Sequence, residues 1–178
     1  MGKTKELLMK FDAKCMKMSD FKFTFFTLGL IMLYHAITIP SEIGIRGVEN
    51  LPQVSLFEDR DLLPLFISVV IITPYIETIV FHTIPLGIYY KIKEKFDLHM
   101  RWDFILAGLL GLIFGLAHAI NYPGFTMKGF DFTLIGSLFA YVFFRYKRLG
   151  KKTVFGLWII HALNNLIAIS PTILFELL

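Results

Sequence analysis

Residues 62–90 read LLPLFISVVIITPYIETIVFHTIPLGIYY, and this apolar run decides the fold class. A helix needs about 20 apolar residues to cross a bilayer core of about 30 Å, so the run is long enough to span a membrane. Pro74 and Pro85 interrupt it. A proline inside a helix lacks a backbone donor and clashes with the preceding turn. We therefore predict a kinked or tilted helix in which Pro74 leaves the carbonyl of Val70 free.

Further apolar runs on both sides of this segment predict more membrane spans. The chain is 56% hydrophobic, contains 19 Phe and has a mean hydropathy of +0.65, which is too apolar for a soluble domain. The expected fold is an all-α, polytopic membrane helix bundle of about five transmembrane helices, integral to a prokaryotic-type cytoplasmic membrane. The other four predicted spans are 21–40, 103–121, 130–144 and 153–169.

Residues 1–20 form a basic segment ahead of the single transmembrane domain that we expect over 21–178. Lysines alternate there with Leu7, Leu8 and other apolar residues at near-helical spacing. This pattern is typical of an amphipathic helix on an anionic membrane surface, and a solvated lead-in to the first span is the alternative. Cys15 is the only cysteine, which excludes an intrachain disulfide, and we interpret it as a small apolar residue.

Basic residues gather in alternate connections between the predicted spans. Fifteen of the 18 Lys and Arg residues lie around the start of the first span, between spans two and three, or between spans four and five. Cytoplasmic loops are enriched in Lys and Arg, so the N-terminus is predicted inside and the C-terminus outside. Contacts with lipid headgroups account for the net charge of +4, and no nucleic-acid partner is expected.

Four polar side chains lie inside apolar runs, namely Glu77, His118, His161 and Asn165. An ionisable group at bilayer depth costs about 2.5–3.5 kcal/mol, so it persists mainly where it pairs, faces a cavity or does chemistry. Glu77 is either a general base or a protonated or salt-paired structural residue, and the proline near it favours a cavity.

A small-residue face precedes His118. Ala107, Gly111 and Gly115 recur every four residues. Such spacing lets a neighbouring helix approach closely, and His118 projects near that contact. His35 has no polar neighbours in its own span and is interpreted as a hydrogen-bonded core residue.

His161 and Asn165 stand four residues apart and therefore share one helical face. An imidazole and a carboxamide side by side offer donors for a developing oxyanion. They would equally form an interhelical hydrogen-bond pair, so both interpretations stay open. Asn164 is expected to point elsewhere.

Taken in order, these residues resemble the CAAX-protease and bacteriocin-processing family of intramembrane endopeptidases, called CPBP or Abi. The resemblance rests on a glutamate helix, then FxxxH ending at His118, then HxxxN from His161 to Asn165. It covers roughly residues 62–169. We therefore expect this part of the chain to form a protease-like core.

The chain departs from the family pattern in the first motif. The family usually has EExxxR, whereas this chain has Glu77 followed by Thr78 and, five residues after the glutamate, His82. We predict Thr78, Phe81, His82 and Phe114 as supporting residues. His82 is expected close enough to Glu77 for a polar contact or a water bridge, and a histidine that snorkels toward the membrane surface is the alternative.

The resemblance implies hydrolysis of a peptide bond within the membrane, in a small hydrophobic, prenylated or lipid-anchored peptide. Glu77 and His118 would activate water, and His161 and Asn165 would stabilise the oxyanion. No cofactor or metal ion is implied, although two histidines and a glutamate are also a plausible zinc set. A catalytically inactive membrane scaffold or immunity protein is the alternative, because the first motif is altered.

The predicted span boundaries place the two water-activating residues at different depths. At about 1.5 Å per residue, straight spans put Glu77 about 22 Å and His118 about 8 Å below the outer surface, too far apart for one site. We therefore expect the second span to bend at Pro74 and the third span to continue past Asn121, which would bring both residues toward mid-depth.

Overall fold

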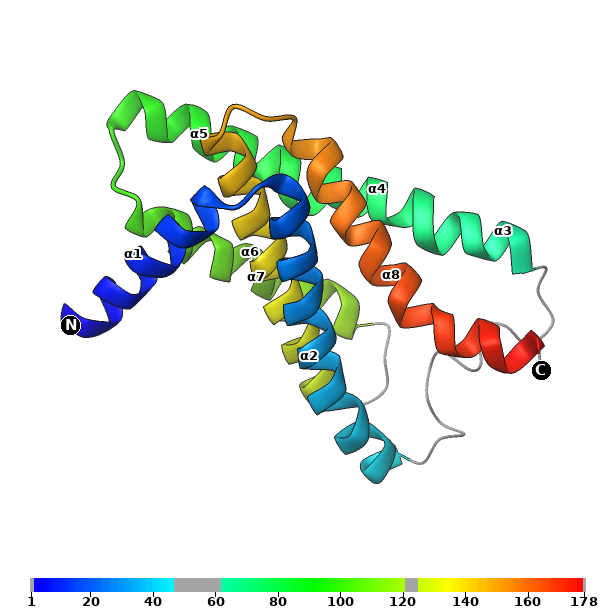
Figure 1. Ribbon diagram of the computed structural model, residues 1–178. Helices are drawn as coiled ribbons and strands as arrows, with labels where there is room; N and C mark the ends of the chain where they lie inside the picture. Colours follow the sequence, from blue (N-terminus) through cyan, green and yellow to red (C-terminus); the bar gives the residue numbers. More distant parts are fainter. Residues whose placement is uncertain (1, 47–61, 121–124, 178) are drawn as a thin grey trace.

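The computed structural model describes the backbone of residues 2–46, 62–120 and 125–177, and the side chains of 6–37, 63–120 and 129–170. These residues form helices joined by short turns, and no strand occurs among them. The all-α expectation is therefore confirmed. The separate helices are α1 (Gly2–Lys17), α2 (Asp20–Arg46), α6 (Arg101–Ala119), α7 (Phe125–Arg148) and α8 (Thr153–Leu177) (Figure 1).

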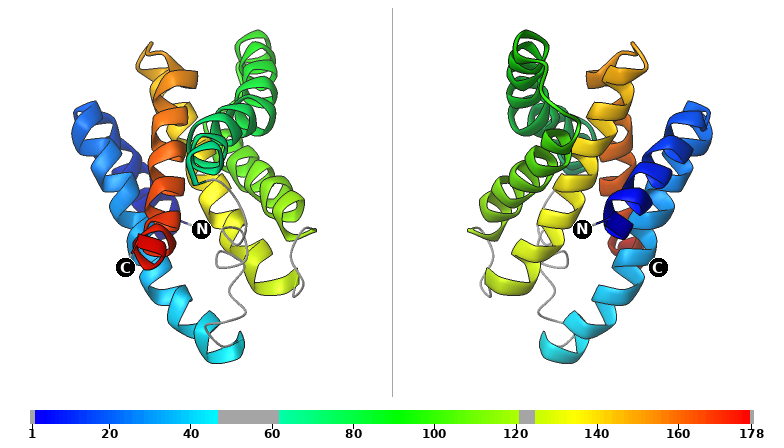
Figure 2. Two further views of the ribbon diagram at one scale, coloured as in Figure 1. Left: turned by 90° about the vertical axis from the view of Figure 1, so that its right-hand side faces the viewer. Right: turned by 90° about the vertical axis from the view of Figure 1, so that its left-hand side faces the viewer.

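Residues 62–96 form one continuous helix whose register changes twice. Its parts are α3 (Leu62–Phe66), η3 (Ile67–Ile72), α4 (Thr73–Glu77), η4 (Thr78–Thr83) and α5 (Ile84–Phe96), of which η3 and η4 are π-helical turns. Figure 2 shows the α3 end almost end-on while α5 rises away from it. The helix is thus bent, as the two prolines predict.

Both π-helical turns end two residues before a proline. In such a turn each N–H donates to the carbonyl five residues back, as the Thr73 N–H does to the Ser68 carbonyl. In this register the missing N–H of Pro74 leaves the carbonyl of Val69 without a helix donor, and not that of Val70 as the sequence predicted. The wider turn also gives the proline ring more room behind it.

Helix α7 lies against α6 at the centre of the bundle. A Cβ added to Gly111 would lie 2.6 Å from the backbone nitrogen of Ser137, and one added to Gly115 would lie 2.8 Å from that of Thr133. The two helices approach this closely only because both positions are glycine. The predicted small-residue face is therefore confirmed, with α7 as its partner.

Four helical stretches among the described residues are long and apolar enough to cross a membrane. They are 20–37, 63–96, 101–119 and 153–170. Helix α7 holds the predicted fourth span, 130–144, and is not one of them. Its residues 139–146 are all buried by other helices, so it carries polar side chains without exposing them to lipid. The polytopic bundle is confirmed, with one helix shielded at its centre.

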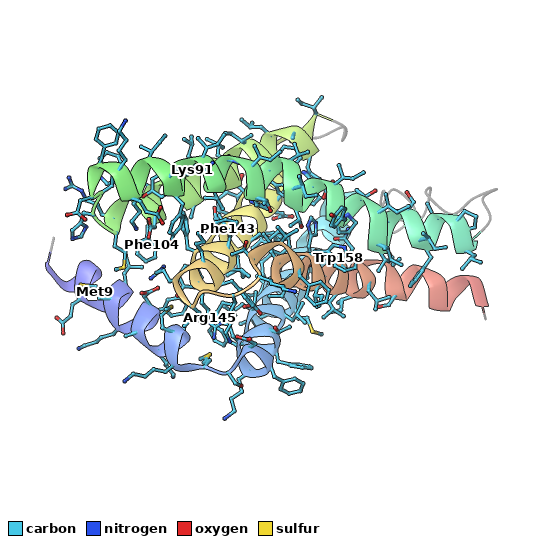
Figure 3. All side chains as sticks on the ribbon, turned by 90° about the horizontal axis from the view of Figure 1, so that it is seen from above. Met9, Lys91, Phe104, Phe143, Arg145 and Trp158 are labelled. Carbon is cyan, nitrogen blue, oxygen red and sulfur yellow. The ribbon has the colours of Figure 1, made fainter. Side chains whose placement is uncertain are left out.

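Helix α8 lies along η3 and η4. Trp158 points at the long helix (Figure 3), and its Nε1 donates to the Ile71 carbonyl at 3.0 Å. The Trp158 ring also meets the ring of Tyr75 edge-on at 5.9 Å. These contacts fix the position of α8 along the helix that carries Glu77.

Helix α1 packs against the end of α7. Arg145 is fully buried between them (Figure 3) and donates from Nε to the Cys15 carbonyl at 3.0 Å and from Nη2 to the Met18 carbonyl at 2.6 Å. Burial raises the pKa of the Cys15 thiol, which keeps it protonated and unreactive. Leu7 and Leu8 of α1 are exposed, and binding of this helix to a membrane surface stays a prediction.

The basic connections lie toward one end of the bundle. Figure 1 shows the α1–α2, α5–α6 and α7–α8 connections in the upper part of the view, with the far end of α2 below. Ion pairs join two of them: Nζ of Lys151 lies 2.6 Å from Oδ2 of Asp20, and Nη1 of Arg148 lies 2.7 Å from Oδ2 of Asp12. This grouping agrees with the predicted topology, and the inside location of the N-terminus stays a prediction.

Candidate active site

The carboxylate of Glu77 lies between two imidazoles. Its Oε1 is 3.3 Å from Nε2 of His118, and its Oε2 is 3.2 Å from Nε2 of His161. The long helix runs obliquely to α2 and α7 (Figure 1), so groups that straight spans would separate in depth come together. The expectation that α6 continues past Asn121 is wrong, because the helix ends at Ala119 and Ile120 is its C-cap residue.

His118 determines how many protons this centre holds. Its Nδ1 lies 2.8 Å from the Phe114 carbonyl, which can only accept a hydrogen bond, so Nδ1 carries a proton. A neutral His118 would then turn the lone pair of Nε2 toward the Glu77 carboxylate. The contact is favourable only when one further proton lies between the two side chains. Glu77 and His118 therefore form an acid–base pair that shares one proton.

Thr78 orients the second imidazole. Its hydroxyl lies 3.4 Å from Nδ1 of His161, and both side chains are almost fully buried. With the Thr78 O–H donating to Nδ1, the Nε2–H of His161 donates to Glu77. The threonine that stands in place of a second glutamate thus has a polar contact of its own in the site.

The centre is more open beside His118 than beside His161. The side chains of Glu77 and His118 keep 18% and 19% of their surface exposed, whereas that of His161 keeps 3%. The carboxylate is therefore accessible from the His118 side, and His161 closes the other side.

Asn165 lies one turn beyond His161 and bonds to the helix that carries Glu77. Its Nδ2 donates at 3.0 Å to the Val69 carbonyl, the group that Pro74 leaves without a helix donor. A primary amide nitrogen carries two N–H groups, so the second stays available for another acceptor.

Asn164 also belongs to this region, although the sequence predicted that it points elsewhere. It is buried, and its Nδ2 donates to Oδ1 of Asn165 at 3.2 Å. Because that oxygen is occupied, the Asn165 amide is oriented with its nitrogen toward Val69. The neighbouring asparagine therefore sets which end of Asn165 acts as the donor.

Phenylalanine rings enclose the imidazoles. The ring centroids of Phe114 and Phe132 lie 4.1 and 4.4 Å from that of His118, and the centroid of Phe139 lies 4.5 Å from that of His161. These contacts fix the planes of the imidazoles and shield the buried ring of His161 from bulk water.

Phe81 is a fourth enclosing ring, with its centroid 6.5 Å from that of His118, and two of the four rings were predicted while two were missed. Phe81 and Phe114 were expected from the motifs, and their rings meet edge-on at 5.4 Å. Phe132 and Phe139 were not expected. They stand seven residues apart and so share one face of α7. That spacing was the available signal, but it does not single them out in a chain with 19 Phe.

His82 lies inside the bundle. It is 0% exposed, and its ring centroid is 5.6 Å from that of Phe114 and 5.9 Å from that of Phe139. Neither ring nitrogen has a hydrogen-bond partner among the described residues. The snorkelling alternative is therefore wrong. The direct hydrogen bond to Glu77 is not formed either, and a water bridge stays a prediction.

Side-chain geometry gives the zinc alternative no support. Among the described residues, no group of three or more His, Cys, Asp or Glu side chains is arranged to hold a metal ion. In the candidate site the two Nε2 atoms instead face the oxygens of one carboxylate.

Comparison with known protein families bears on the same part of the chain. A family described as type II CAAX prenyl endopeptidase Rce1-like matches residues 59–167. The chain belongs to this family. The CPBP resemblance is thereby confirmed, and the Rce1-like match includes Glu77, His118, His161 and Asn165. The family match supports the prediction that the chain is a membrane protease. Comparisons with curated proteins and with solved structures found no match.

Proposed function

We propose that this Rce1-like protein hydrolyses a peptide bond of a small hydrophobic or lipid-anchored peptide within the membrane. The observation that carries the proposal is the Glu77 carboxylate held between the Nε2 atoms of His118 and His161. A carboxylate that shares a proton with an imidazole can take a proton from water and later return it to a leaving amine.

The proposed reaction begins with a water molecule at Glu77. With the shared proton on His118, Glu77 is ionised and takes one proton from the water as the water oxygen attacks the peptide carbonyl carbon. The C–N bond of the tetrahedral intermediate then breaks. The amine leaves with the proton that Glu77 had taken, and the carboxylate and imidazolium return to their starting form.

His161 and Asn165 are the proposed donors to the oxyanion. Once Glu77 has taken a proton, the Nε2–H of His161 is no longer held by a full negative charge and can donate to the intermediate. The second N–H of Asn165 is the other donor.

Replacing Asn165 tests the oxyanion role. Loss of one such donor typically lowers kcat about 10²–10³-fold, so we expect Asn165→Ala to slow cleavage by about that factor with a smaller change in KM. Steady-state kinetics of the purified variant measure both constants. A change confined to KM would contradict the oxyanion role.

Replacing Glu77 tests the reaction itself. The purified protein is incubated with a farnesylated peptide that ends in a CAAX sequence, and the products are identified by mass spectrometry. We expect Glu77→Gln to abolish cleavage, because the amide cannot act as a base but keeps the size of the side chain. The matched control is Glu94→Gln, which changes an exposed glutamate on the same long helix and should cleave normally.

A Glu77→Gln variant as active as the wild type would refute the protease proposal. The inactive scaffold or immunity function would then take its place, with the altered first motif as its explanation.

A further inference from the structure

His82 is a buried polar residue with no role in the reaction proposed above. A neutral imidazole has one N–H donor and one acceptor nitrogen, and in His82 both lack a hydrogen-bond partner among the described residues. Leaving such groups unpaired in a buried position destabilises the fold. A phenylalanine or leucine would fill the same space without that cost. A histidine at this position therefore indicates a function that needs its ring nitrogens.

The π-helical turn η4 brings His82 onto the face of Glu77. In an α-helix, the residue five positions further on lies about 140° around the axis, on another face. A π-helical turn has about 4.4 residues per turn, so the same residue lies only about 50° away. The register change at Thr78–Thr83 thus turns His82 toward the site, and π-helical turns of this kind are frequent at functional sites.

His82 shares its surroundings with His161. Both imidazoles contact the rings of Phe114 and Phe139. His82 also interacts electrostatically with Glu77 and His161. It is therefore a hydrogen-bonding side chain inside the aromatic enclosure on the closed, His161 side of the carboxylate.

We propose that His82 is the residue that holds water inside this enclosure for delivery to Glu77. The inference rests on the proposed function, because hydrolysis within an apolar bundle requires a bound water beside the base. A water that donates to one ring nitrogen or accepts from the other is held by a group that has no competing protein partner. His82 then acts on the water and not on the peptide.

Variants at His82 separate this role from simple packing. Cleavage of a farnesylated CAAX peptide is compared for wild type, His82→Phe and His82→Gln, and the melting temperature of each purified protein is measured. For His82→Phe we expect kcat to fall about tenfold or more, because the water is no longer positioned, with KM nearly unchanged. We expect the melting temperature to stay close to that of the wild type, because an apolar ring of similar shape replaces both the imidazole and its water. His82→Gln keeps a donor and an acceptor and should recover part of the rate.

His35→Phe is the matched control. Nε2 of His35 is also buried without a hydrogen-bond partner among the described residues, but this histidine lies on α2, outside the catalytic enclosure. Its replacement should leave kcat unchanged.

Glu77→Gln, assayed beside these variants, separates the two proposals. If it is inactive while His82→Phe keeps the wild-type kcat, the water-holding role is refuted and the protease proposal stands. If Glu77→Gln is active, the protease proposal fails. Equal losses of kcat in His82→Phe and His82→Gln would also overturn the inference, because glutamine keeps a donor and an acceptor for the water.

Discussion

A single hydroxyl decides which ring nitrogen of His161 carries the proton. Only one ring nitrogen of a neutral imidazole carries a proton, and the hydrogen-bond partner of one nitrogen determines whether the other is protonated. Thr78 lies 3.4 Å from Nδ1 of His161 and is itself 0% exposed, so water does not compete for that nitrogen. A second glutamate at this position would add a charge, whereas threonine supplies a neutral donor. The altered first motif is therefore compatible with an active centre.

Thr78→Val removes this hydroxyl while keeping the shape of the side chain. Nδ1 of His161 then loses its hydrogen-bond donor and can itself carry the ring proton. In that state Nε2 faces Glu77 without a proton. We expect kcat for the farnesylated peptide to fall about tenfold or more, in the lower range of effects seen for groups that orient a catalytic side chain. Thr78→Ser keeps the hydroxyl and should retain most of the activity. Equal rates for the Val and Ser variants would show that the hydroxyl does not orient His161.

The residues of the centre differ in how far sequence could predict them. Glu77, His118 and His161 stand out because a polar group inside an apolar run needs a partner, and the structure brings these three together. Asn164 could not be placed in this way, because side-chain direction depends on which helix lies opposite. The unpaired state of His82 follows from burial on all sides and is likewise invisible in the sequence.

At the scale of the helix, the prolines were predictable and the π-helical turns were not. Pro74 and Pro85 indicate a break in regular helical hydrogen bonding. Either a kink or a wider turn can accommodate the missing N–H donor. The choice depends on packing, because the widened turn offers the Val69 carbonyl to Asn165 on α8. The partner must be in place before the wider turn is favoured. The bend was therefore expected, whereas the register that positions Asn165 and His82 was not.

The contact between α6 and α7 depends on glycine at one position and not at its neighbour three residues earlier. A Cβ at Gly111 would lie 2.6 Å from the Ser137 nitrogen, whereas one at Gly108 would meet nothing within 4 Å. We expect Gly111→Ala to reduce the free energy of unfolding by about 1–3 kcal/mol through overpacking. Gly108→Ala should be neutral or slightly stabilising, because alanine favours the helix. Thermal unfolding of both variants in detergent measures the difference, and equal melting temperatures would contradict the close contact.

At the scale of the whole molecule, the buried central helix α7 carries polar side chains, while the helices around it present apolar side chains to lipid. The helices around α7 expose Ile, Leu and Phe side chains on their outer faces. Helix α7 itself presents Phe139 to His161 and Arg145 to the Cys15 carbonyl of α1. It falls short of the hydropathy expected of a span because its neighbours supply the apolar surface. Counting apolar runs therefore predicts the number of helices better than it predicts which of them face lipid.

The arrangement of the connections predicts the topology. The basic α1–α2, α5–α6 and α7–α8 connections lie toward one end of the bundle, and α8 runs from that end toward the other (Figure 1). Because Lys and Arg are retained on the cytoplasmic side, these connections should be inside and the C-terminus outside. Alkaline phosphatase fused to the C-terminus should therefore be active and green fluorescent protein fused there should be dark. A cysteine placed at Leu98, in the α5–α6 connection, should resist an impermeant maleimide until the cells are opened. The opposite pattern in both measurements would reverse the orientation and place the basic connections outside.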